Sequence, residues 1–329
     1  MTQNRMTVKF WGVRGSIPAP LSPALVDQKM HRLMRAAFDA GVTAETLDAW
    51  LASQPRHATS TYGGNTSCVE VRAGGKLVIL DMGTGLRELG NALMPEILKT
   101  GTFDATFLVS HVHWDHVQGH PFFAPIYLSN TKARGTMNFW GGVNWKTPLK
   151  NVLSNQMEVP KFPMEFKKVQ QEGLAMKFHT VSDRQTIVIP TPEGEIKIIC
   201  RRLNHPQETY GYRLEFGGAS AVYSTDNENF AIPDPPLVEL VSGADVWIQD
   251  CEYDRDEYEG RKGVPKLNWG HSEPNYVAAV GKKAQPDQIV TFHHNPDASD
   301  AHVASIAREV QTLSGIPTAA AYEGMTIAL

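Results

Sequence analysis

A cluster of potential metal ligands follows one short apolar run, and it constrains the fold more than any other feature. Directly after the run 105–109 come four such side chains within six residues: His111, His113, Asp115 and His116. Neutral imidazole and carboxylate groups suit zinc and other borderline first-row metals. If the run is a strand that ends in a loop and a helix start, the first two histidines can reach one point and the last two side chains a second. The cluster therefore predicts metal binding at the end of a strand.

Three further candidate ligands also follow runs that are typical of strands. They are His205 after 195–203, Asp226 after 220–225 and His293 after 288–292. A lone histidine is seldom a ligand, and an aspartate after a strand is usually a turn former. Their shared placement at strand ends is what makes these three residues candidates. His294 adjoins His293, so the strand-end argument leaves the choice between these two histidines open.

Short β-rich runs and helical patterns are mixed along the whole chain. Runs of four to six residues with β-branched or aromatic side chains lie at 8–11, 68–71, 77–81, 105–110, 195–200, 211–216, 221–224, 245–248 and 288–292. Helical spacing is found at 25–39, 44–52, 85–98, 147–156, 273–284 and 299–313. This mixture indicates an α/β architecture.

Two segments interrupt the β-rich pattern without forming domains of their own. Residues 19–58 are helical and polar, and we expect a helical insertion there. Residues 129–175 contain several prolines and a Gly-Gly pair, and we expect an irregular insertion. The sequence has no internal repeat, so we expect a single domain over residues 1–329.

Composition and charge narrow the class of protein. The net charge of −4 gives no long-range attraction for nucleic acid or an anionic membrane. Three widely spaced cysteines form neither a disulfide framework nor a metal knuckle. The first residues lack the apolar core of a signal peptide, and no run of about 18 apolar residues occurs. We therefore expect a cytoplasmic protein without a membrane span.

Eight short motifs spread over most of the chain carry a family resemblance. They lie at 10–18, 62–68, 80–85, 111–116, 204–206, 224–226, 269–272 and 292–296. With them the chain resembles the metallo-β-lactamase-fold hydrolases, whose signature is a His-x-His-x-Asp-His loop. It is similar in particular to the branch that holds cyclic-nucleotide phosphodiesterases and tRNA 3′-processing endonucleases (ribonuclease Z). The resemblance implies a four-layer αββα sandwich, in which two mixed β-sheets are flanked by helices.

The resemblance also implies a ligand set for two divalent ions, with zinc the first choice and manganese or iron the alternatives. One ion is implied at His111, His113 and His205, the other at Asp115, His116 and His293, with Asp226 bridging both. Asp81 is implied to orient a ligand or the loop without binding metal itself. The position in the family motif favours His293 over His294.

The implied activity is hydrolysis of a phosphodiester, most simply a cyclic nucleotide or another small diester. Two ions about 3.5–4 Å apart lower the pKa of a shared water and bind phosphate oxygens. Asp115 is then expected to help aim the attacking hydroxide. His271, in a Gly-His-Ser motif, is the candidate general acid or cationic clamp on the phosphate. The alternative for His271 is a solvent-facing side chain at a helix start, beside a capping Ser272.

Two other functions remain open at this stage. A tRNA 3′-processing endoribonuclease would need a basic RNA-binding surface, for which only the lysines of 129–175 are candidates. A non-catalytic metal-binding or sensor protein would usually have lost a ligand, and all seven are present. We therefore expect a small phosphodiester as partner, with nucleic acid possible but not favoured. A homodimer is compatible with the resemblance.

Overall fold

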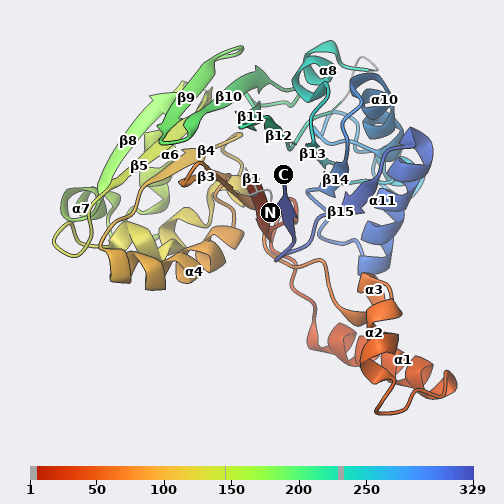
Figure 1. Ribbon diagram of the computed structural model, residues 1–329. Coiled ribbons are helices and arrows are strands. Elements are labelled where there is room, and N and C mark those ends of the chain that lie inside the picture. The colour runs from red at the N-terminus through yellow and green to blue at the C-terminus, as the bar shows by residue number, and fades with distance from the viewer. Residues whose placement is uncertain (1–5, 145, 229–232) are drawn as a thin grey trace.

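The computed structural model describes residues 6–144, 146–228 and 233–329. Two seven-stranded β-sheets face each other, and helices cover their outer faces (Figure 1). This confirms the expected αββα sandwich of two mixed sheets. Among the helices of the described residues, none combines the length and the apolar character that crossing a bilayer requires.

The first sheet contains the N-terminal strand and the strand that precedes the histidine loop. Its order is β16 (Thr326–Ala328), β1 (Met6–Gly12), β2 (Cys68–Ala73), β3 (Lys76–Leu80), β4 (Ala105–Leu108), β5 (Thr136–Gly141) and β8 (Ala175–Thr180). Strands β16 to β3 pair antiparallel, and strands β3 to β8 pair parallel. The parallel half therefore presents the carboxyl ends of β3 and β4 at one edge, where ligands usually bind.

The second sheet supplies the remaining strand ends. Its order is β15 (Thr318–Ala320), β14 (Ile289–Phe292), β13 (Val246–Asp250), β12 (Ala219–Ser224), β11 (Tyr210–Phe216), β10 (Gly194–Arg202) and β9 (Thr186–Thr191). Strands β12 to β15 are parallel to one another. Every residue of β13 and β14 is buried, as expected for parallel strands covered on both faces. A small separate hairpin joins β6 (Val143–Asn144) to β7 (Thr147–Pro148).

Helices cover both sheets on the outside (Figure 1). The first sheet has α4 (Gly85–Thr100), α6 (Leu149–Gln156) and α7 (Phe166–Glu172), and the second has α8 (Pro235–Val241), α10 (Pro274–Ala284) and α11 (Asp300–Ser314). Shorter helical turns are also present: α5 (Trp114–Val117), η1 (His120–Phe122), η2 (Ala124–Tyr127) and α9 (Arg255–Tyr258). In α4 the apolar side chains at helical spacing, Leu86, Leu89, Leu93 and Ile97, are all buried.

Large apolar cores fill the interfaces between the four layers. The core between the sheets includes the ring of Phe292, which contacts the rings of Phe10 and Tyr223. A second core fills the space between the first sheet and α4, and a third lies between the second sheet and its helices. Because side chains fix the two sheets face to face, the strand ends at the shared edge hold constant relative positions.

The two predicted insertions differ in outcome. Most of residues 19–58 are helical, in α1 (Pro23–Asp39), α2 (Leu47–Ser53) and all but the last residue of α3 (Arg56–Thr59). This segment extends away from both sheets (Figure 1). The expectation of an irregular insertion over 129–175 is wrong, because β5 within it is an internal strand of the first sheet. Met137 and Phe139 alternate inward on β5, a pattern that the surrounding glycines and prolines obscure.

Candidate metal centre

The histidine loop lies where β4 meets α5. His111 and His113 are in the connection after the strand, and Asp115 and His116 are in the first turn of the helix. The amide of His116 donates to the carbonyl of His113 at 3.0 Å, which closes that turn. The turn separates the two pairs of side chains, so they face different points as the spacing predicts.

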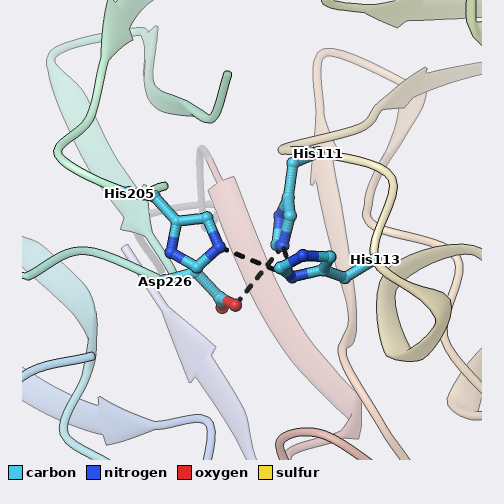
Figure 2. A group of neighbouring side chains, drawn as sticks. All are labelled: His111, His113, His205 and Asp226. Carbon is cyan, nitrogen blue, oxygen red and sulfur yellow. Dashed lines mark hydrogen bonds and ion pairs between the residues drawn. The ribbon is translucent and has the colours of Figure 1, made fainter. Parts of the chain in front are cut away.

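One cluster joins the loop to the second sheet. His111, His113, His205 and Asp226 each offer an atom, and these atoms all lie within 4.8 Å of one another (Figure 2). Nε2 of His111 is 2.8 Å from Nδ1 of His113. Nε2 of His205 is 3.4 Å from the same Nδ1 atom. His205 follows β10 and Asp226 follows β12, so three separate strand ends build this cluster.

A second cluster lies beside the first. Asp115, His116 and His293 also offer atoms that are all within 4.8 Å of one another. Oδ2 of Asp115 is 3.2 Å from Nε2 of His116 and 3.0 Å from Nε2 of His293. The ring of His294 points elsewhere, and its Nε2 lies 2.9 Å from the carbonyl of Ala321. The geometry therefore brings His293, and not His294, to the cluster.

Asp226 contacts both clusters. Its Oδ1 is 3.3 Å from Nε2 of His116 and 3.2 Å from Nε2 of His293. Its Oδ2 is 3.4 Å from Nε2 of His111. One carboxylate oxygen thus faces each set of histidines, which is the arrangement that a bridging ligand requires.

Left-handed backbone places three of the predicted site residues. Asp81, Asp226 and His293 have φ values of 60°, 49° and 56°. Such values are uncommon outside glycine, and aspartate and histidine are among the residues that tolerate them best. Each residue lies just beyond the end of a strand, so the turn redirects its side chain from the alternation of the sheet toward the shared edge.

Asp81 holds the histidine loop in place through hydrogen bonds. Its carboxylate accepts hydrogen bonds from the amide of Ser110 at 2.7 Å and from the hydroxyl of Tyr223 at 2.7 Å. Nδ1 of His116 lies 2.8 Å from the same carboxylate. This contact directs Nε2 of His116 toward Asp226, in accord with the predicted orienting role. On the opposite side, Nδ1 of His205 lies 3.1 Å from the carbonyl of Gly270.

Burial and charge give the first cluster the protonation state that metal binding needs. Burial lowers the pKa of His111 well below its usual value and that of His205 to about 4, so both imidazoles are neutral. Burial alone would raise the pKa of Asp226, but the imidazoles of His293 and His116 hold it well below its usual value. Neutral imidazoles around an ionised carboxylate are the ligand form of these side chains.

The second cluster carries more negative charge. Burial opposes protonation of His116 and His293, but neighbouring carboxylates outweigh it and raise both pKa values well above the usual range. The strongest of these carboxylates are Asp115 for His116 and Asp226 for His293. The same carboxylates favour a divalent cation between the rings. The nitrogen and oxygen donors of the two clusters therefore suit a divalent metal site.

Two buried carboxylates that the sequence motifs did not predict lie next to His271. Nδ1 of His271 lies 3.1 Å from Asp250 and 3.3 Å from Glu252. Glu252 also lies 2.9 Å from Nδ1 of His293. Burial would lower the pKa of His271, but Glu252 and then Asp250 raise it to about 9. Both acids follow the predicted strand 245–248, which is the placement that identified Asp226 and could have found them.

His271 is buried against the two clusters. Its ring stacks on that of His293 at a centroid distance of 5.0 Å and meets the ring of His205 edge-on at 5.8 Å. The alternative of a solvent-facing side chain is therefore wrong, since the side chain is buried among these rings and carboxylates. The glutamate that caps α10 is Glu273, and it accepts hydrogen bonds from the amides of Asn275 and Tyr276. The predicted cap at Ser272 is thus displaced by one residue.

Curated relatives match part of the chain. An uncharacterized protein of Mycobacterium leprae is 34% identical over 120 residues, which are 36% of this chain and 38% of that protein. Ribonuclease BN of Proteus mirabilis is 25% identical over 198 residues, which are 57% of this chain and 58% of that protein. The chain thus matches less than two thirds of the length of either relative.

Solved structures match nearly the whole chain. Zn(2+)-bound PqqB of Methylobacterium extorquens has a TM-score of 0.63 and 15% identity, covering 98% of this chain and 100% of the other. Unliganded yeast PDE1 has a TM-score of 0.62 and 12% identity, covering 99% and 100%. A diphosphatase from the PhnP family has a TM-score of 0.58 and 20% identity, covering 99% and 98%. At these identities the similarity establishes the fold.

A family model agrees with the fold and with the position of the clusters. The model of the beta-lactamase superfamily domain matches residues 77–294, which is more than half of the chain. The matched region runs from β3 to His294 and so includes all seven candidate ligands. The chain therefore belongs to the beta-lactamase superfamily, in its metallo-β-lactamase fold.

Proposed function

We propose that this protein is a dinuclear metallohydrolase that cleaves a small phosphodiester, with a cyclic nucleotide as the leading candidate. One observation carries the proposal: Asp226 presents one oxygen to each of two histidine clusters, and the buried ring of His271 lies beside them. Phosphodiester cleavage needs a paired cation site for the phosphate oxygens and a proton for the leaving oxygen. The chain offers side chains suited to both needs.

We assign zinc as the metal, with manganese or iron as alternatives, because histidine and aspartate make up the donor set. His111, His113 and His205 would hold one ion, Asp115, His116 and His293 would hold the other, and Asp226 would contribute an oxygen to each. When bound, the two ions supply Lewis acidity toward phosphate oxygens and lower the pKa of water. Ser16 steadies Asp115, since its amide donates to Oδ2 of that residue at 2.8 Å.

His271 supplies the proton in this proposal. With a pKa raised to about 9, its imidazole is cationic at neutral pH. Asp250 and Glu252 hold its Nδ1, and among the described residues Nε2 has no hydrogen-bond partner. Nε2 is therefore the atom that donates to the leaving oxygen, and the positive ring also attracts the phosphate before cleavage.

The substrate class rests on chemistry and on the relatives together. One structural neighbour is a diphosphatase from the PhnP family, and another is yeast PDE1. A substrate with one phosphate linkage needs no extended basic surface, in keeping with the net charge of −4. These points favour a small diester over a polynucleotide.

A substrate panel tests the proposal. Protein loaded with zinc or manganese is assayed on cyclic nucleotides, a chromogenic phosphodiester, a glutathione thioester and a β-lactam. We expect turnover of the diesters, abolished by Asp115→Ala. His271→Ala should slow turnover by two to four orders of magnitude, about the range of general acid catalysis, with metal content unchanged. Rapid cleavage of the thioester or lactam, with none of any diester, would remove the proposal.

A second candidate is cleavage of RNA, favoured by the match to Ribonuclease BN. That activity would use exposed basic side chains of the segment around β5 to α7, such as Lys132, Lys150 and Lys167. Binding of a precursor tRNA should then weaken steeply as salt rises. Replacing these three lysines by glutamate should abolish RNA binding and leave cleavage of a small diester unchanged. RNA binding whose affinity changes neither with salt nor with the lysine replacements would exclude this candidate.

A further inference from the structure

One buried glutamate has no part in the chemistry proposed above. Glu228 follows Asp226 by two residues, and its side chain is fully buried. Removing a carboxylate from water is costly unless hydrogen-bond donors replace the water. Among the described residues three donors do so: the hydroxyl of Tyr258 is 2.6 Å and the amide of Asn268 is 2.7 Å from Oε1, and the amide of Gly270 is 2.7 Å from Oε2. The carboxylate therefore holds the loop that precedes α10 against the chain that follows β12.

The main chain of Glu228 holds the segment that carries His205. Its amide donates to the carbonyl of Asn204 at 2.7 Å. Its carbonyl accepts a hydrogen bond from Nδ2 of Asn204 at 2.6 Å. Because Asn204 immediately precedes His205, these two hydrogen bonds fix the backbone next to the ligand.

The side chain of Glu228 reaches the ring of His205 through one glycine. Gly270 donates its amide to Glu228, and its carbonyl lies 3.1 Å from Nδ1 of His205. A neutral imidazole that donates from Nδ1 keeps Nε2 free as the ligand atom, and Nε2 of His205 is the atom that faces His113 (Figure 2). A Cβ on Gly270 would lie 1.9 Å from Nδ1 of His205, so the glycine and the ring are in close contact. A shift of Gly270 therefore moves the ring.

We propose that Glu228 is the positioning residue of His205. Its main chain fixes the backbone beside this ligand, and its carboxylate fixes the glycine that directs the ring. The inference rests on the dinuclear site proposed above and concerns one of its two ions, the ion at His111, His113 and His205, which we call the first ion. Loss of the Glu228 carboxylate should turn Nε2 of His205 away from this ion.

The second cluster has supports of its own. Asp81 lies 2.8 Å from Nδ1 of His116. Glu252 lies 2.9 Å from Nδ1 of His293. Neither contact passes through Glu228, so the ion at the second cluster should be insensitive to its loss. An effect on the first ion alone thus separates positioning of His205 from a general loss of structure.

Glu228→Gln tests the proposal with little change in shape. A glutamine amide has one oxygen, and the two donors at Oε1 draw this oxygen to that position. Its NH2 group then faces the amide of Gly270, so two donors meet and the hydrogen bond to Gly270 is lost. Loss of such support typically weakens metal binding 10- to 100-fold. Competition with a zinc chelator should show this loss for the first ion and wild-type affinity for the other.

Nitrogen NMR of the histidine rings assigns the effect and reports on the ring without activity. In metal-free wild-type protein, His205 should carry its proton on Nδ1. In Glu228→Gln it should be a mixture of the two neutral forms, whereas the ring of His116 should be unchanged. During the zinc titration, the signals of these two rings tell which ion is bound.

Tyr258→Phe is the matched control, because it removes a donor from the same carboxylate and leaves the amide of Gly270 in place. It should bind both ions as the wild type does. Circular dichroism reports whether each variant is folded. If Glu228→Gln does not fold, Glu228→Asp, which keeps the charge and shortens the reach, should show the same selective loss.

Three outcomes would overturn the inference. Wild-type affinity for both ions in a folded Glu228 variant would do so, and so would equal weakening of both ions. Equal weakening of the first ion by Tyr258→Phe would show that Glu228 acts only by holding α9. A wild-type protein that binds fewer than two ions would instead remove the proposed function, and this inference with it.

Discussion

Glu252 offers the sharpest prediction about the site, because its carboxylate contacts the ring of the proposed metal ligand His293. Its Oε2 is 2.9 Å from Nδ1 of His293, which leaves Nε2 of that ring facing Asp115 and Asp226. Loss of such a contact typically weakens metal binding 10- to 100-fold, or about 1.4–2.7 kcal/mol. Glu252→Ala should therefore lower the affinity for the ion at Asp115, His116 and His293 by this factor. The affinity for the ion at His111, His113 and His205 should stay nearly unchanged.

Competition with a zinc chelator measures both affinities in one titration. Asp245→Ala is the matched control, because Asp245 precedes β13 whereas Glu252 follows it. Asp245 lies at the far end of the strand, where it accepts hydrogen bonds from Ser220. The control should bind both ions as the wild type does. Wild-type affinity at both sites in Glu252→Ala, or equal weakening of both, would refute the reasoning.

The same variant should change the pH dependence of turnover. Glu252 is the strongest of the charges that raise the pKa of His271, so its removal lowers that pKa. His271 donates only while protonated, and turnover falls as pH rises through its pKa. The alkaline limb of the pH profile should therefore move to lower pH in Glu252→Ala with both ions saturating. An unmoved limb would exclude His271 as the donor.

Three further predictions concern packing and stability. Gly270 has a φ of 95° and no room for a Cβ beside the ring of His205, so Gly270→Ala should lose zinc. The control Gly263→Ala, with a φ of 136° and open space around it, should retain zinc, and equal retention by the two variants would contradict this prediction. Burial lowers the pKa of His120 to about 4, whereas the pKa of an unfolded histidine is about 6.5. Between about pH 7 and pH 5, the free energy of unfolding of the wild type should therefore fall by about 2 kcal/mol relative to that of His120→Leu. Denaturant unfolding measures this difference, and a difference that does not change with pH would contradict the prediction. Asp300→Ala leaves the buried Arg14 without its carboxylate and should lower the free energy of unfolding by about 3 kcal/mol; a loss below about 1 kcal/mol would show that the contact contributes little.

The seven candidate ligands lie close together because each of them follows a strand. Consecutive parallel strands end at one edge, so residues as distant as His111 and His293 meet there. Asp250 and Glu252 obey the same rule, but carboxylates after a strand are common turn formers, and nothing local distinguishes them. Their role depends on the ring of His271, which comes from another loop.

Some strands could not be predicted from the sequence, for a different reason. β8 and β9 lie at the outer edges of the two sheets and are partly exposed, so their apolar pattern is weak. β15 and β16 have three residues each, too short for a periodic signal.

Anomalous diffraction at the zinc edge, from crystals grown with zinc, tests the central claim most directly. We expect two peaks, one among His111, His113 and His205 and one among Asp115, His116 and His293, with an oxygen of Asp226 near each. A single peak, or peaks bound elsewhere while these side chains stay metal-free, would contradict it.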